Sequence, residues 1–116
     1  MKTILKLEEL PQLLLSILLF TNTDFSWWWY LLLFFTPDFG MLAYLFNPRV
    51  GAFFYNLFHH KGIVILIYLV GNLMDLPSLE LIGSVYFGHA AFDRIFGYGL
   101  KYPDDFKNTH LGWIGK

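Results

Sequence analysis

Four long apolar segments limit what this chain can fold into. They cover about residues 4–20, 27–46, 51–70 and 79–100, and each is close to the roughly 20 residues that a helix needs to cross a membrane. The polar connections TNTDFS, NPR and GNLMDLPS separate them. Hydrophobic residues make up 56% of the chain, more than in most soluble domains. We therefore expect one all-α membrane domain over residues 1–116, a polytopic four-helix bundle.

Basic residues alternate between the two sides of this arrangement. Lys2 and Lys6 precede the first segment, Arg49 lies between the second and third, and lysines at positions 101, 107 and 116 follow the fourth. The other two connections contain no lysine or arginine. Because cytoplasmic loops accumulate these residues, the pattern predicts a multi-pass protein of the cell membrane with both termini in the cytoplasm.

Charge and cysteine content exclude several classes of function. A net charge of −1 offers no basic surface for nucleic acid, so we expect the lipid bilayer to be the main partner; a homodimer is also compatible with the sequence. The absence of cysteine excludes disulfides, iron–sulfur clusters and thiolate zinc sites. Any metal must therefore bind to His, Asp, Glu or Asn.

The first segment allows two interpretations. Glu8 and Glu9 interrupt it, and only a short uncharged run follows Pro11. It either crosses the membrane or lies flat at the interface. No cleavage site of small residues follows it, so we expect a retained helix rather than a cleaved signal.

Five polar side chains fall within the predicted helices at similar depths. Counted from the cytoplasmic helix ends at about 1.5 Å per residue, they would lie very roughly 9 to 16 Å deep. Glu8 would lie slightly shallower. Because a lone charge near the bilayer centre costs about 2.5 to 3.5 kcal/mol, we expect these groups to find partners on other helices. The five are Asp38, Asn56, His59, His89 and Asp93.

Helical spacing predicts which of these side chains share a face. His89 and Asp93 are four residues apart, and Asn56 precedes His59 by three, so the members of each pair lie on one face of a helix. The first pair shares its stripe with glycine and alanine residues that allow close helix approach, which predicts the interior of the bundle. Leu81, on the other side of that helix, is predicted to face lipid.

Two sites inside the segments predict breaks in the helices. Thr36-Pro37-Asp38 has the form of an N-cap followed by proline, and His59-His60-Lys61-Gly62 interrupts the third segment. Irregular backbone at this depth must be buried in protein or line a wet cavity. Lys61 is expected either to extend toward the membrane interface or to pair with a carboxylate at mid-depth, and Arg94 to reach the headgroups or to pair with Glu8.

The polar layer has two interpretations. In the first, it is a hydrogen-bonded network that fixes the register of the helices. In the second, it is a metal or proton site in which His59 and His89 supply imidazole nitrogens and Asp38 and Asp93 supply carboxylates, a set that suits zinc, iron or manganese. Spacing alone does not decide between them.

Residues 101–116 are too polar to cross a membrane. Their glycines, proline and aromatic residues predict a compact flap on the cytoplasmic surface. His110, within this flap, is the residue that could reach back toward the polar layer.

Three stretches carry a resemblance to a known family. They are PDFGMLAYL at 37–45, PRVGAFFYNLFHH at 48–60 and GHAAFDRIFGYGLKYPDDFKNTHLG at 88–112. They resemble a family of small, mostly bacterial four-helix membrane proteins known as a domain of unknown function. The resemblance implies a four-helix membrane protein and no particular activity. It extends to the polar residues Glu8, Asp38, Asn56, His59, His89, Asp93, Arg94 and His110. At position 60 the sequence departs from the family's small polar residue, which favours His59 over His60 as a ligand.

Three functions are compatible with these observations. The leading hypothesis is an integral membrane protein whose buried His/Asp site performs metal-dependent chemistry on a lipid-soluble substrate. In it, His59, His89 and Asp93 bind the metal, Asp38 is a fourth ligand or a general base, and His110 closes the site as a catalytic residue. The alternatives are a proton-coupled small transporter and a non-catalytic membrane subunit.

Overall fold

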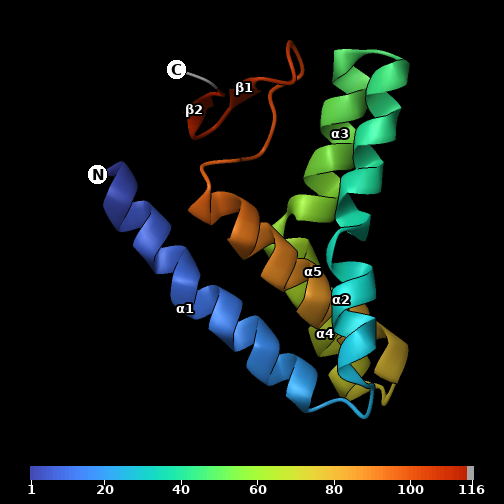
Figure 1. Ribbon diagram of the computed structural model, residues 1–116. Helices are drawn as coiled ribbons and strands as arrows, with labels where there is room; N and C mark the ends of the chain where they lie inside the picture. The colour runs from blue at the N-terminus through green and yellow to red at the C-terminus, as the bar shows by residue number, and fades with distance from the viewer. Residues whose placement is uncertain (115–116) are drawn as a thin grey trace.

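The computed structural model describes residues 1–114 of the chain, which form five α-helices, one 3-10 helix and a two-stranded hairpin (Figure 1). The expected all-α class is confirmed, but the second and third apolar segments each divide into two helical pieces. The elements are α1 (Lys2–Thr21), α2 (Trp27–Phe34), η1 (Thr36–Leu45), α3 (Pro48–His59), α4 (Lys61–Leu73), α5 (Pro77–Ile95), β1 (Asn108–Thr109) and β2 (Gly112–Trp113).

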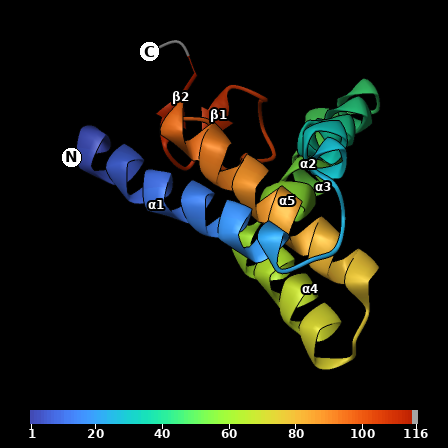
Figure 2. The same cartoon turned by 60° about the horizontal axis from the view of Figure 1, so that its bottom comes forward.

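Helix α5 is the central element of the fold. It lies between α1 and α4, and α2 packs across it (Figures 1 and 2). Small residues allow this close packing, as predicted: a Cβ atom added to Gly83 would lie 2.7 Å from the Cβ of Tyr68 on α4, and Ala90 is buried. The prediction that Leu81 faces lipid is wrong, because α1 and α2 cover that side of α5 and enclose Leu81 with Phe20.

Polar contacts fix the position of α1 on α5. The hydroxyl of Ser16 donates to the carbonyl of Ser84 at 2.5 Å, and its oxygen lies 2.9 Å from the hydroxyl of Tyr30 on α2. Ser16 and Ser84 are fully buried. One hydroxyl therefore links three helices inside the apolar core.

The helix breaks occur where the sequence predicted them. After α2, Pro37 stands in the first turn of η1, and the hydroxyl of Thr36 donates to the carbonyl of Leu33 at 2.7 Å. Between α3 and α4, His60 caps the new helix by accepting from the amide of Ile63 at 3.2 Å. The helical axis bends by 45° between α3 and α4. The third apolar segment thus divides into two helices, because His60 has extended backbone.

Within residues 1–114, no helix taken singly has both the length and the hydropathy required for a membrane crossing, whereas the bent pair α3 and α4 meets both requirements together.

After α5 the chain forms the flap. Strands β1 and β2 pair in antiparallel fashion, and Lys101 forms a bridge with Thr109. The flap and the start of α1 lie at the same end of the molecule (Figure 1). Residues 115 and 116, the end of the predicted flap, lie outside the described residues.

Candidate metal centre

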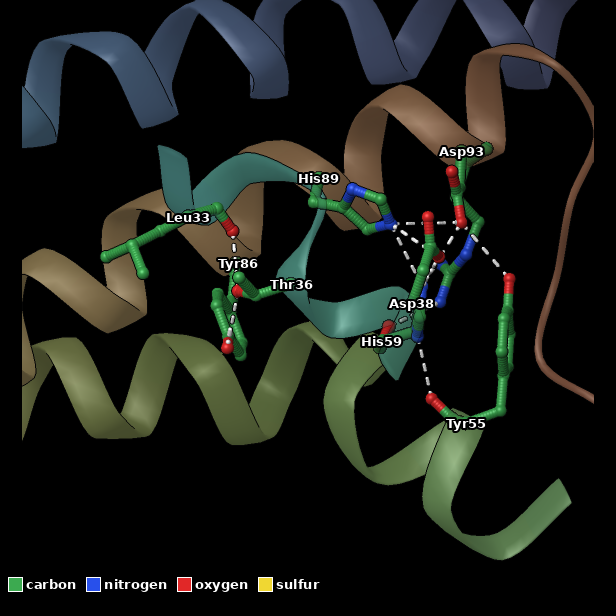
Figure 3. A network of polar contacts seen from close by, with 9 residues as sticks. Leu33, Thr36, Asp38, Tyr55, His59, Tyr86, His89 and Asp93 are labelled. Carbon is green, nitrogen blue, oxygen red and sulfur yellow. Dashed lines mark hydrogen bonds and ion pairs between the residues drawn. The ribbon is translucent and has the colours of Figure 1, made fainter. Parts of the chain in front are cut away.

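Four of the predicted polar residues converge at one point between η1, α3 and α5 (Figure 3). Each offers one ligand atom, and these four atoms all lie within 4.8 Å of one another. Asp38 comes from η1, His59 from the end of α3, and His89 and Asp93 from adjacent turns of α5. We call these four residues the His/Asp cluster.

Five of the six distances between these ligand atoms are close to the edge of a tetrahedron around a metal ion, and the sixth, between the two carboxylate oxygens, is at most 4.8 Å. Nε2 of His89 lies 3.1 Å from Oδ1 of Asp38 and 3.5 Å from Oδ2 of Asp93. Nε2 of His59 lies 3.3 Å and 3.2 Å from the same two oxygens. The two Nε2 atoms are 3.1 Å apart. Four ligands about 2.0 to 2.1 Å from a tetrahedral zinc ion would lie about 3.3 to 3.4 Å from one another.

A backbone contact sets the tautomer of His59. Its Nδ1–H donates to the carbonyl of Tyr55, one turn earlier in α3, at 2.8 Å. The ring of Tyr55 stacks on the imidazole at 3.8 Å between centroids. With a proton on Nδ1, neutral His59 directs the lone pair of Nε2 into the cluster. This is the orientation in which imidazole binds a metal.

Further contacts support the remaining ligands. The hydroxyl of Tyr55 donates to Oδ2 of Asp93 at 3.1 Å, and Nη2 of Arg94 donates to the carbonyl of His59 at 3.4 Å. The ring of His89 packs edge-on against Phe34, with 5.3 Å between centroids. Nδ1 of His89 is buried and has no hydrogen-bond partner within residues 1–114.

The carboxylates form the open side of the cluster. The side chains of His59 and His89 are 3% and 1% exposed, whereas those of Asp93 and Asp38 are 14% and 40% exposed. Both carboxylates line a cavity of about 320 Å³ beneath the flap. We call it the flap cavity; its other lining residues include Met41, Tyr55, Tyr98, Lys101, Phe106 and Ile114. A small molecule can therefore approach the cluster from its acidic side.

A family model described as domain of unknown function (DUF4260) matches residues 2–114. The chain belongs to this family. No curated protein and no solved structure matches it. Membership confirms the resemblance that three stretches of the sequence carry. Since the family description names no activity, what this DUF4260 chain does has to be argued from its own site.

The side chain of Asn56, on α3, binds the backbone of the flap rather than the cluster. Its Nδ2 donates to the carbonyl of Lys101 at 2.8 Å, and its Oδ1 accepts from the amide of Lys101 at 2.6 Å. The expectation that Asn56 joins His59 in one polar layer is not met, because the flap backbone offers the side chain both a donor and an acceptor. Asn56 is one of the residues to which the family resemblance extends, and it attaches the flap to α3.

His110 lies away from the position predicted for it. Its Nδ1 accepts from the amide of Leu100 at 2.8 Å, and it lines a different cavity, of about 430 Å³, with Glu9 and Arg94. Burial and then the charge of Arg94 lower the pKa of His110. The expectation that His110 closes the cluster is not met, because hydrogen bonds with the backbone of Leu100 hold His110 away from it.

On α1 the inward-facing acid is Glu9 and not Glu8. Glu8 is exposed, whereas Glu9 is 9% exposed and pairs with Nζ of Lys61. Lys61 also donates to Oε1 of Gln12 at 2.6 Å. Of the two interpretations of Lys61, the structure shows the pairing with a carboxylate. Glu9 precedes the buried Ser16 by seven residues and therefore lies on the same face of α1.

Two residues of the flap cavity were not expected from the sequence. In the sequence, Tyr55 is one of many aromatic residues in an apolar segment, and Lys101 is one of the basic residues that predict which side of the membrane a segment faces. Lys101 is only 5% exposed. Its Nζ lies 4.7 Å from the ring centroid of Tyr55 and 4.0 Å from that of Phe106. Burial lowers the pKa of Lys101 to about 8, although the charges of Asp93 and Asp38 raise it in part.

Proposed function

We propose that this protein is a zinc-dependent membrane enzyme that acts on a lipid-soluble substrate at the His/Asp cluster. The observation that carries the proposal is the convergence of two imidazole nitrogens and two carboxylate oxygens from three separate elements, all within 4.8 Å of one another. Of the metals that suit this ligand set, zinc fits a four-coordinate tetrahedral site best.

A shared cation explains the cluster better than hydrogen bonds alone. If both Nε2 atoms carry protons, both N–H groups have to share one acceptor, Oδ1 of Asp38, at 3.1 and 3.3 Å, while the two donor nitrogens lie 3.1 Å apart. If only His89 carries one, the lone pair of His59 faces Oδ2 of Asp93 at 3.2 Å with no proton between them. One divalent cation among the four atoms removes both conflicts, because each atom then donates a lone pair to it.

Asp38 is the ligand best placed for a role in chemistry. A zinc ion in such a site supplies Lewis acidity and makes water a better nucleophile at neutral pH. The side chain of Asp38 is the most exposed of the four and faces the flap cavity. It can act as the fourth ligand at rest and as a general base when water or substrate takes its place. Tyr55 holds Asp93 in position through its hydroxyl.

The outer surface supports the membrane part of the proposal. Large apolar side chains are exposed along α1, α2, η1, α3 and α4, and extended apolar surfaces of this kind mark contact with a membrane or with a partner. They are leucine, phenylalanine and tryptophan rather than the small residues that tight helix partners use, which favours lipid over a protein partner. Examples are Leu7, Leu18, Trp28, Leu32, Leu45, Phe46 and Phe53.

Metal analysis of the protein purified in detergent tests the proposal. We expect one zinc ion per chain in the wild type and its loss in His89→Ala. His60→Asn is the matched control: it replaces a neighbouring histidine and keeps an N-cap for α4, so its zinc content should equal that of the wild type. Wild-type protein without stoichiometric metal, or full zinc content in His89→Ala, would reject the proposal.

A further inference from the structure

The ammonium group of Lys101 lies in the flap cavity without an anionic partner in contact. Within residues 1–114, its Nζ makes cation–π contacts with Tyr55 and Phe106 and forms no hydrogen bond or ion pair. A charge that is removed from water is usually paired, because desolvation is costly. Aromatic faces offset only part of that cost. The position thus favours a ligand that brings a negative charge.

The fold keeps this amine in place. Asn56 binds both the amide and the carbonyl of Lys101, and Thr109 pairs with it from the flap. The backbone is therefore fixed on two sides, while the side chain extends into the cavity that Asp38 and Asp93 also line. A residue fixed in this way is suited to binding, since little order has to be gained when a ligand arrives.

Among the groups that line the flap cavity, a metal at the cluster would leave the positive charge of Lys101 uncompensated. A divalent metal and the carboxylates of Asp38 and Asp93 sum to zero, and the two metal-bound imidazoles are neutral. Lys101 then adds one positive charge, because the carboxylates that face it are neutralised by the metal. This step rests on the proposed metal centre. The site consequently matches a group with a single negative charge.

We propose that the substrate is a lipid phosphodiester, whose anionic phosphate is bound between the metal and the ammonium of Lys101. A phosphodiester carries one negative charge and also contains a bond that Lewis-acid catalysis can hydrolyse, unlike a carboxylate. The oxygen of water bonds to phosphorus, the P–O bond to one alcohol breaks, and that alcohol leaves with a proton, giving a phosphomonoester and an alcohol. Met41, Phe106 and Ile114 give the flap cavity an apolar wall for the lipid portion.

Binding of short-chain lipids to the zinc-loaded full chain in detergent tests this assignment by calorimetry. The probes are dihexanoyl phosphatidylglycerol, which has one phosphodiester, and dihexanoylglycerol, which has none. We expect wild-type protein to bind the first at least about 10-fold more tightly. Dimethyl phosphate distinguishes the two sources of the anion: it should compete, but more weakly, because it lacks the apolar chains. Equal binding of dimethyl phosphate and phosphatidylglycerol would overturn the lipid part of the assignment.

Lys101→Met tests the role of the amine, because methionine keeps the length of the side chain and removes its charge. We expect affinity for phosphatidylglycerol to fall by about 10- to 100-fold, with affinity for dihexanoylglycerol unchanged. The matched control is Lys107→Met, at an exposed lysine of the same flap, which should bind like wild type.

Zinc content, measured on the same samples, separates the two proposals. Loss of phosphatidylglycerol binding with zinc retained in Lys101→Met supports the inference. Unchanged binding in zinc-loaded Lys101→Met overturns it and leaves the metal centre intact, whereas wild type that holds no zinc overturns the metal centre itself. If Lys101→Met does not fold, the wild-type comparison decides: equal affinity for the phosphodiester and the neutral lipid rejects the inference.

Discussion

The Nε2 atoms of His59 and His89 lie 3.1 Å apart, and each lies within 3.5 Å of the same two carboxylate oxygens. The two histidines are 30 residues apart in sequence and belong to α3 and α5. Two basic nitrogens at this separation repel each other when both are protonated. Their arrangement around two carboxylates could hold one metal ion, which is the basis of the proposed function.

Removing the hydroxyl of Tyr55 should weaken the metal site without unfolding it. In Tyr55→Phe the ring still stacks on His59 and the backbone carbonyl still accepts from Nδ1, but Asp93 loses its donor. We expect zinc affinity to fall by about 10-fold, the lower end of the effect of losing such a supporting hydrogen bond. Competition with a chromophoric chelator measures it. Tyr102→Phe, at an exposed tyrosine of the flap, is the control, and equal affinities in the two variants would refute the role of Tyr55.

Replacing the buried acid of α1 should destabilise the protein. In Glu9→Gln the ammonium of Lys61 loses its carboxylate while it stays largely buried, with a side chain 16% exposed. Breaking a buried pair in this way costs about 3 kcal/mol. Thermal unfolding in detergent should show a clear drop in the midpoint for Glu9→Gln and almost none for Glu8→Gln, the exposed neighbour. The opposite order would mean that α1 is rotated relative to the structure described.

Releasing the flap should expose its backbone to solvent. In Asn56→Ala the amide and carbonyl of Lys101 lose both partners, a change that costs about 1 to 3 kcal/mol. Hydrogen–deuterium exchange of peptides that contain Lys101 should become faster, while α5 keeps its protection. Asn108→Ala, which removes only an exposed contact to Asp104, serves as control. Unaltered exchange in Asn56→Ala would show that other contacts hold the flap.

The affinity for phosphodiesters should depend on pH through Lys101. Burial lowers the pKa of Lys101 to about 8, and the protonated amine is the form that binds an anion. The zinc ion neutralises the two carboxylates that raise this pKa in part, so affinity for dihexanoyl phosphatidylglycerol should decrease as the pH rises toward about 8 and beyond it. Calorimetry between pH 6.5 and about 9.5 measures this, with Lys101→Met expected to be flat over the same range. A decrease of the same size in Lys101→Met would assign the titration to another group.

Much of the site was predictable because helices convert spacing into direction. His89 and Asp93 share a face of α5. The helix breaks near Asp38 and His59 place these two residues at a similar predicted depth in the membrane. Polar groups in apolar helices must then meet, which the sequence alone could indicate. The convergence of these four residues follows from that reasoning.

Other features depended on packing that the sequence does not contain. A rotation of α1 by one residue exchanges Glu8 for Glu9, and contacts such as those of Ser16 with α5 and α2 set that rotation. Leu81 is buried because α1 and α2 cover the side of α5 that was predicted to face lipid. His110 is turned away from the cluster by a hydrogen bond within the flap, which no helical spacing describes.

X-ray absorption spectroscopy of the zinc-loaded protein tests the central claim most directly. The His/Asp cluster predicts four nitrogen and oxygen ligands at about 2.0 to 2.1 Å, with outer-shell scattering from two imidazole rings that falls to one ring in His59→Ala. A six-coordinate zinc ion, or a spectrum without imidazole scattering, would contradict it.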